Sequence, residues 1–126
     1  MAAKQFLAPF LWICFLFSAT RSQSPAVIPL SSEPHHHLAL HNEYVNLYQV
    51  EVAPHDTVIL HRHDFDAISA MLSDSEVTLR APGKPDVHQT LSDRQIRLQP
   101  RSYVHSTTVE GSTTYHNVTV ELLLLQ

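Results

Sequence analysis

Two histidines, His61 and His63, lie one residue apart in the stretch ILHRHDFD, among apolar residues. Because side chains at i and i+2 point to the same side of a β-strand, both rings are predicted to lie together on one face. Two neutral imidazoles at this spacing can bind a divalent metal ion, but a usable site needs further donors from elsewhere. His105, in the later stretch PRSYVHS, is the natural third ligand. The alternative is a pair of hydrogen-bonded histidines at the mouth of a barrel, with no metal.

Strand parity also predicts which neighbours share a face with the histidines. Ile59 should lie beside them, and Val58 should lie on the opposite face. Farther along, Asp66 shares a face with three apolar side chains, those of Ile68, Ala70 and Leu72. If that face is interior, the carboxylate of Asp66 points inward with it.

The elements that must position these residues are short β-strands separated by turn residues. We expect strands at Glu43–Ala53, Thr57–His63, Asp66–Leu72, Glu76–Ala81, Val87–Leu91, Gln95–Gln99, Tyr103–Thr108 and Thr114–Leu124. Many short strands at near-regular spacing predict an all-β antiparallel sandwich or barrel. The chain has only two glycines, Gly83 and Gly111, which excludes the glycine-rich loops that cradle phosphates.

The last strand, TTYHNVTVELLLL, alternates clearly between apolar and polar residues. The set that contains His116 and the following Val and Leu residues is predicted to face the core. His116 would then line the cavity of the barrel. The other set, which contains Asn117, should face solvent. Asn117-Val118-Thr119 also has the pattern of a glycosylation acceptor.

The histidine stretch lies within a longer segment, HDTVILHRHDFDAISAMLSDSEVTL, that resembles the first motif of the cupin family. That motif runs Gly, five residues, His-x-His, three or four residues, Glu, six residues and Gly. The segment RQIRLQPRSYVHSTTVEG resembles the second motif: Gly, five residues, Pro-x-Gly, two residues and His. Its spacing fits at Pro100 and His105. The resemblance covers roughly residues 41 to 124.

The sequence departs from the family pattern in two ways. Four residues stand where the family usually has glycine, namely His55, Asp74, Arg94 and Ser102. The usual Glu positions fall at Ala67 or Ile68, neither of which can bind a metal. Asp66 lies one residue early and is interpreted as a weak ligand or as a residue that orients one.

The cupin resemblance implies a double-stranded β-helix, a small antiparallel jelly-roll barrel, with the histidines on the inner wall of a pocket. His61, His63 and His105 would hold a divalent metal ion. The resemblance does not distinguish Zn, Mn, Fe and Ni, and a barrel that binds no metal stays an alternative. Tyr103, in phase with His105, would donate a proton or a hydrogen bond. Two functions stay open: a module that binds a metal ion or small molecule, and a metal-dependent enzyme such as a dioxygenase or isomerase. Cupins also often pair, so a homodimer is an expectation.

The first 22 residues differ in kind from the rest. Lys4 precedes an apolar run from Phe6 to Ala19, which is short for a bilayer span of roughly 20 residues and typical of a secretory signal. We therefore expect a signal peptide at 1–22, a secreted or periplasmic protein and no stable membrane span after cleavage. Cleavage would remove the only cysteine, Cys14, and would leave 6 basic against 12 acidic residues, a net charge of −6. This balance excludes nucleic acid as a partner.

The predicted organisation after the signal has two parts. Residues 23–40, rich in Ser and Pro, are interpreted as an extended arm or linker, and residues 41–126 as the cupin-like domain. The run His35–His37 lies at the edge of that linker, and we expect it to be solvated. The string HRHDFD also lacks the HxHxDH pattern of zinc hydrolases, because Phe65 and Asp66 replace its Asp and its final His.

Overall fold

The computed structural model describes residues 23–124, so the predicted signal peptide at 1–22 lies outside the described residues. The described part contains ten strands and one short 3-10 helix. These elements are β1 (Ile28–Pro29), η1 (Leu30–Ser32), β2 (His36–His41), β3 (Val45–Val52), β4 (Thr57–Arg62), β5 (Ala67–Met71), β6 (Ser75–Arg80), β7 (Val87–Leu91), β8 (Ile96–Gln99), β9 (Val104–Val109) and β10 (Tyr115–Leu122). Within residues 23–124, no helix is long and apolar enough to cross a membrane.

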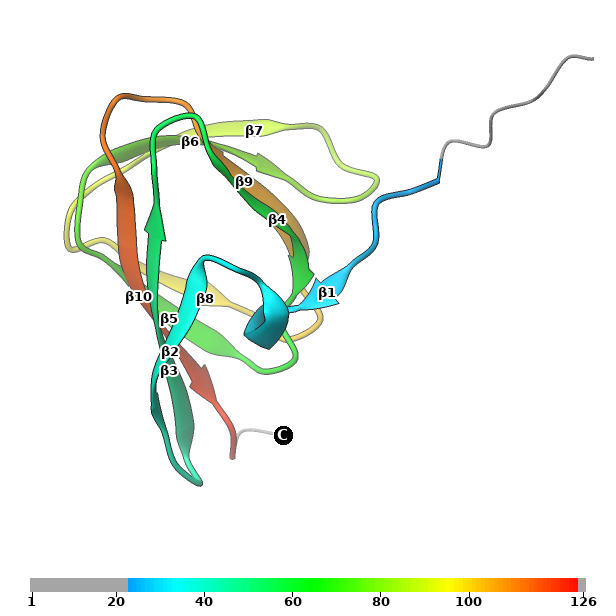
Figure 1. Cartoon of the computed structure of the whole chain (residues 1–126), viewed down its shortest axis with the longest axis vertical. Helices are drawn as coiled ribbons and strands as arrows, with labels where there is room; N and C mark the ends of the chain where they lie inside the picture. Colours follow the sequence, from blue (N-terminus) through cyan, green and yellow to red (C-terminus); the bar gives the residue numbers. More distant parts are fainter. Residues whose placement is uncertain (1–22, 125–126) are drawn as a thin grey trace, which may run out of the picture.

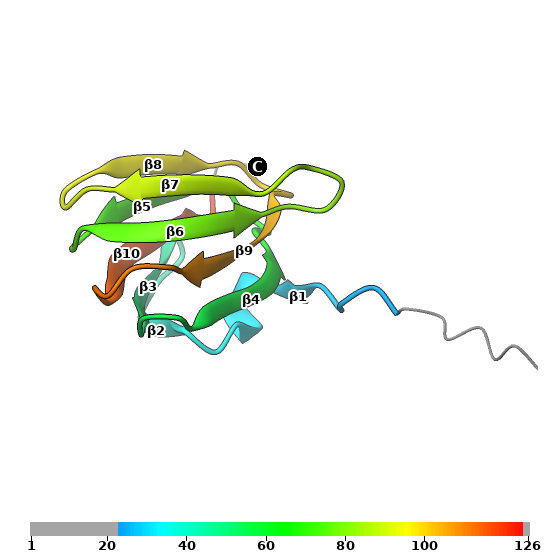
Figure 2. The same ribbon diagram turned by 90° about the horizontal axis from the view of Figure 1, so that it is seen from above.

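The strands form two five-stranded sheets that curve around a common interior (Figure 1). One sheet has the order β1-β4-β9-β6-β7 and the other has the order β2-β3-β10-β5-β8. All pairings are antiparallel except that of β1 with β4. Figure 2 shows the strands from above, with the segment that leads into β1 extending away from the barrel. The predicted all-β antiparallel barrel is therefore confirmed.

The apolar core fills the part of the interior that the histidines leave free. It contains side chains from both sheets and from η1, namely Leu30, Tyr48, Val50, Val52, Val58, Met71, Val77, Leu79, Leu91, Val109 and Tyr115. β-Branched and aromatic residues suit such a pleated, half-buried surface. The core thereby holds the two sheets together around the polar site.

All eight predicted strands are present, and the sequence interpretation missed two more. Residues 23–40, expected to be a linker, contain β1, η1 and most of β2. Ile28 pairs with His61 on β4, and Leu30 is only 1% exposed. The part from Ile28 onward is therefore built into the barrel. Local sequence could not show this, because the Ser- and Pro-rich segment gains its order from tertiary contacts.

The last strand, β10, faces the opposite way from the sequence prediction. Tyr115, Asn117, Thr119 and Glu121 are buried, whereas the alternate side chains, including His116, are partly exposed on the outer face. The prediction assumed that the apolar set covers an apolar core. Here the barrel encloses polar side chains that hydrogen-bond to one another, so the polar set points inward.

A β-bulge in β4 explains a second wrong prediction of parity. Val58 pairs with Thr107 and His61 pairs with His105, so β4 has one more residue than β9 between these pairs. Val58 is therefore buried on the same side as the histidines, and Ile59 is exposed. An extra residue of this kind reverses which side chains face inward after it.

Three of the residues that replace the family's glycines adopt the left-handed backbone conformation that favours glycine. The φ angles are 67° at His55, 66° at Arg94 and 66° at Ser102. The N–H groups of His55 and Arg94 donate to the strand carbonyls of Val109 and Met71, and the N–H of Ser102 donates to the carbonyl of His63, directly after β4. The turns therefore keep the geometry of the motif, at a cost of roughly 1–2 kcal/mol for each non-glycine residue.

Candidate metal centre

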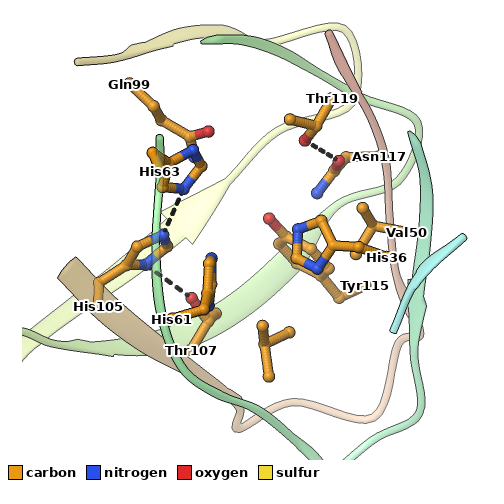
Figure 3. A pocket seen from close by; sticks show the side chains of 11 residues that line it. His36, Val50, His61, His63, Gln99, His105, Thr107, Tyr115, Asn117 and Thr119 are labelled. Carbon is orange, nitrogen blue, oxygen red and sulfur yellow. Dashed lines mark hydrogen bonds between the residues drawn. The ribbon is translucent and has the colours of Figure 1, made fainter. Parts of the chain in front are cut away.

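Three buried imidazoles meet inside the barrel. His61 lies on β4, His63 directly follows that strand, and His105 lies on β9. One nitrogen from each ring lies within 4.8 Å of those of the other two. The ring centroids of His61 and His105 are 4.5 Å apart, and the two other pairs are 5.2 Å apart. Figure 3 shows the three rings gathered along one side of the cavity.

The pairing of β4 with β9 brings these residues together. His61 stands directly opposite His105 in the antiparallel register. The N–H of His63 donates to the carbonyl of Tyr103, and the N–H of Ser102 donates to the carbonyl of His63 at 2.7 Å. The left-handed turn at Ser102 thus fixes His63 beside His105. The sequence spacing predicted that these three histidines come together, and they do.

The ring nitrogens of these histidines are incompletely paired. His61 Nδ1 donates to the carbonyl of Ile59 at 2.9 Å, which leaves Nε2 without a proton. His63 Nε2 and His105 Nε2 are 3.0 Å apart, so one of them donates to the other. Among the described side chains, only His61 Nε2 and His63 Nδ1 are buried polar atoms with no partner. Such an atom costs about 1–3 kcal/mol, and a bound cation would remove that cost.

Burial keeps the three imidazoles neutral. Burial, together with the smaller effect of the neighbouring imidazoles, lowers the pKa of His63 from 6.5 to about 3 and that of His105 to about 2. Burial also lowers the pKa of His61, against the opposing effect of its hydrogen bond to Ile59. Metal ligands must be deprotonated, so the site is ready to bind an ion without first releasing a proton from an imidazolium.

The donor set fits a divalent transition metal. Nitrogen ligands at 2.0–2.1 Å in a tetrahedral site lie roughly 3.3 Å from one another. His63 Nε2 and His105 Nε2, 3.0 Å apart, already lie near this spacing, and one nitrogen from each of the three rings lies within 4.8 Å of the others.

Asp66 does not join this site. Its carboxylate accepts the backbone N–H of Arg101 at 2.8 Å and lies 3.6 Å from the Arg101 guanidinium. The interior positions of β5 are Ala67, Ser69 and Met71, so the face that Asp66 shares is the outer one. The interpretation of Asp66 as a ligand was wrong. Asp66 does share a face with Ile68 and Ala70, as predicted, but that face lies on the outside of the barrel and not on the inside.

The two other predicted pocket residues lie in different places. Tyr103 stacks on His105 with ring centroids 4.5 Å apart and an interplanar angle of 15°. It restrains the ring of His105 and does not line the cavity. His116 points away from the interior, with Nε2 3.5 Å from the carboxylate of Glu51. The prediction that His116 lines the cavity was wrong for the same reason as the orientation of β10.

A hydrogen-bonded wall of hydroxyl and amide groups, which sequence reasoning missed, completes the interior. Ser69 Oγ donates to Gln99 Oε1 at 3.0 Å, and Thr119 Oγ1 lies 3.4 Å from Ser69 Oγ and 2.9 Å from Asn117 Oδ1. We call these four residues the amide–hydroxyl wall. Figure 3 shows Asn117 and Thr119 across the cavity from His61 and His105. Their polar character had predicted a solvent-facing surface.

Sequence reasoning also missed His36 and Glu33. His36 lines the cavity, and its ring centroid is 5.1 Å from that of His61. His36 Nδ1 donates to the buried carboxylate of Glu33 at 2.7 Å. The signal that could have found this pair is an acidic residue three positions before a histidine in a segment that was dismissed as a linker.

The cavity between these groups is very small. Its volume is about 10 Å³, and it is lined by imidazoles, by Gln99, Asn117 and Thr119 of the amide–hydroxyl wall, by Thr107 and by a few core residues. One water molecule needs roughly 10–15 Å³ on this measure. The cavity therefore has room for about one water-sized group and not for an organic molecule.

No protein-family model and no curated protein sequence matches the chain. Solved structures do match it. A cupin domain from Bordetella pertussis is 20% identical with a TM-score of 0.64, and the match covers 68% of this chain and 88% of that one. A protein with a double-stranded β-helix domain from Klebsiella pneumoniae is 18% identical with a TM-score of 0.59, covering 76% and 82%.

The matched structures also include an enzyme, the polyketide cyclase of Streptomyces resistomycificus. It is 18% identical with a TM-score of 0.55, and the match covers 65% of this chain and 56% of the cyclase. At these identities the likeness establishes the fold alone. The chain therefore has the cupin fold, as its two motifs indicated. Whether it is an enzyme must be argued from its own site.

Proposed function

We propose that the protein binds one divalent transition-metal ion through His61, His63 and His105 and acts as a binding module. The observation that carries this proposal is the cluster of three buried, neutral imidazoles with two unpaired nitrogens. Buried polar groups normally find partners, so two unpaired ring nitrogens in one buried cluster need an explanation. A bound cation supplies it.

The donor set narrows the kind of ion. Imidazole ligands suit Zn, Fe and Ni, whereas carboxylate and carbonyl oxygens suit Mg and Ca. No carboxylate belongs to the cluster. When bound, such an ion would act as a Lewis acid toward a water-sized ligand in the cavity.

The size of the cavity favours binding over turnover of an organic substrate. A volume of about 10 Å³ is far below the roughly 300–1,000 Å³ of ordinary ligand pockets. The alternative function, a metal-dependent enzyme of dioxygenase or isomerase type, would require the walls to part. Export through the segment 1–22 and pairing into a homodimer stay predictions that accompany the proposal.

Elemental analysis tests the proposed function. The tag-free protein should carry His37→Ser and His41→Ser, because both residues are exposed and could capture metal adventitiously. His35 and His36 stay unchanged, since Glu33 holds both. We expect about one Zn, Fe or Ni per chain. A protein that purifies without metal, and whose melting temperature does not move when these ions are added, would refute the proposal.

A further inference from the structure

Glu33 is a fully buried carboxylate next to the histidine cluster. The residue is 2% exposed and its side chain 0%. It accepts hydrogen bonds from the backbone N–H of His35, from His35 Nδ1 and from His36 Nδ1, at 2.9, 3.1 and 2.7 Å. It also accepts the backbone N–H of Ile59 at 3.2 Å. A buried charge needs this number of partners.

The contact with Ile59 links Glu33 to a metal ligand. Ile59 lies in the bulge of β4, outside the paired register. Its N–H donates to Glu33, while its carbonyl accepts from His61 Nδ1 at 2.9 Å. The bulge aims His61 inward, and the carbonyl of the bulged residue fixes its tautomer. Glu33 therefore holds the same residue that orients His61.

The contact with His36 acts on the same cavity. His36 Nδ1 donates to Glu33 at 2.7 Å, and this hydrogen bond fixes the orientation of the His36 ring. The ring packs against His61 and forms part of the cavity lining. One carboxylate thus orients two of the imidazoles that surround the cavity.

We propose that Glu33 is the positioning carboxylate of the metal site: through Ile59 and His36 it sets the geometry in which His61 receives the ion. This inference rests on the proposed function. The carboxylate that the family motif would supply as a ligand is absent, and an acidic residue from the N-terminal segment acts instead, without touching the ion. Its negative charge, close to the imidazoles, also favours a cation in the cavity.

Glu121 offers a matched control. It is also buried, at 3% exposure, and accepts hydrogen bonds from Asn46 Nδ2 at 2.9 Å and from the Tyr48 hydroxyl at 3.3 Å. Unlike Glu33, it makes no hydrogen bond to His36 or to Ile59. Removing either carboxylate should cost stability, but only Glu33 should affect the metal.

The test compares Glu33→Ala, Glu33→Gln and Glu121→Ala in the full chain. Affinity for Zn²⁺ is measured by competition with a chelator, and ligand geometry by the visible spectrum of the Co²⁺-loaded protein. Residues that orient metal ligands typically contribute 10–100-fold in affinity. We expect Glu33→Ala to lose affinity in that range with an altered Co²⁺ spectrum. Glu33→Gln, which keeps an acceptor for the Ile59 N–H, should recover part of the affinity, and Glu121→Ala should match the wild type.

Two outcomes would overturn the inference. If Glu33→Ala and Glu33→Gln both bind Zn²⁺ as the wild type does and give its Co²⁺ spectrum, Glu33 is only structural. If Glu121→Ala loses affinity to the same extent, the loss reflects general destabilisation. If Glu33→Ala does not fold, the Glu33→Gln variant decides the question. Zn²⁺ affinity and a Co²⁺ spectrum equal to those of the wild type in Glu33→Gln would contradict a role for the charge of Glu33 and for its contact with His36. Failure of the proposed function is separate, since the wild type itself would then bind no metal.

Discussion

The two polar walls of the cavity are both buried, but their hydrogen bonding differs. In the amide–hydroxyl wall, the side chains of Ser69, Gln99, Asn117 and Thr119 are bonded to one another. The imidazole wall consists of His61, His63 and His105, and in it His61 Nε2 and His63 Nδ1 have no hydrogen-bond partner. A satisfied polar network specifies and stabilises an interior, whereas unsatisfied groups cost free energy that the fold must supply. Burial of polar groups therefore does not by itself mark a functional site. The unpaired atoms do.

The largest effect is expected from the loss of one imidazole. In His105→Ala only His61 and His63 remain, and two imidazoles alone hold an ion weakly. We expect Zn²⁺ affinity to fall by more than the ~100-fold that marks residues which only orient ligands. Isothermal titration calorimetry measures it. His116→Ala, on the outer face, is the control and should leave affinity unchanged; equal losses in the two variants would contradict the assignment of the imidazole wall.

Breaking the amide–hydroxyl wall should give the converse result. Ser69→Ala removes the donor to Gln99 and the hydroxyl beside Thr119. A buried group left without a partner costs about 1–3 kcal/mol, so the free energy of unfolding in urea should fall by that amount. Zn²⁺ affinity should stay within a factor of a few of the wild type. A large loss of affinity with unchanged stability would show that the two walls had been assigned the wrong roles.

The imidazole wall should also make the metal-free protein acid-sensitive. The folded pKa values of His63 and His105 are about 3 and about 2, against 6.5 in the unfolded chain. Below pH 6.5 the unfolded state therefore binds protons that the folded state does not, and stability falls as the pH decreases.

Glu33 adds to this loss at lower pH. Burial alone would raise its pKa, but hydrogen bonds from His36 and His35 outweigh burial and lower the pKa from 4.5 to about 2. Its contribution to stability is present above pH 4.5 and is lost as the pH falls toward 2. His35 acts in the opposite sense. Burial lowers its pKa, but hydrogen bonds to Glu33 and Asp56 outweigh burial and raise the pKa above 6.5. Its contribution to the stability of the fold is therefore present at low pH and is lost as the pH rises through the raised pKa.

Urea unfolding of the metal-free protein at about pH 7 and about pH 5 measures the combined effect. We expect lower stability at the lower pH, and a smaller difference in His105→Gln, which has one less buried imidazole. Equal stability of the wild type at both values would show that the imidazole wall is not kept neutral by burial.

The smallest effect is expected in the turns outside both walls. Replacing His55 or Arg94, which have positive φ angles, by glycine removes roughly 1–2 kcal/mol of backbone strain. The greater conformational freedom of glycine stabilises the unfolded chain and offsets about 0.4–1 kcal/mol of that gain. Each variant should therefore be more stable in urea by up to ~1.6 kcal/mol. Ser92→Gly, in a turn without a positive φ, should be destabilised instead, and a matching gain there would rule out strain as the cause.

The sequence predicted the strands, the cupin fold and the meeting of His61, His63 and His105, because a two-residue period and the motif spacing encode them locally. It could not predict which face of β5 and β10 is interior, since that depends on whether the enclosed volume is apolar or polar. The bulge in β4 could not be predicted either, because one extra residue leaves the order of apolar and polar residues in the sequence almost unchanged. Glu33 and His36 were missed because their order comes from partners far along the chain.

The measurement that tests the central claim most directly is a crystal structure of the Zn²⁺-loaded protein with anomalous scattering recorded at the zinc edge. The account predicts one strong anomalous peak inside the barrel, at about 2.0–2.1 Å from a nitrogen of each of His61, His63 and His105. A peak only at the exposed His37 and His41, or none at all inside the barrel, would contradict it.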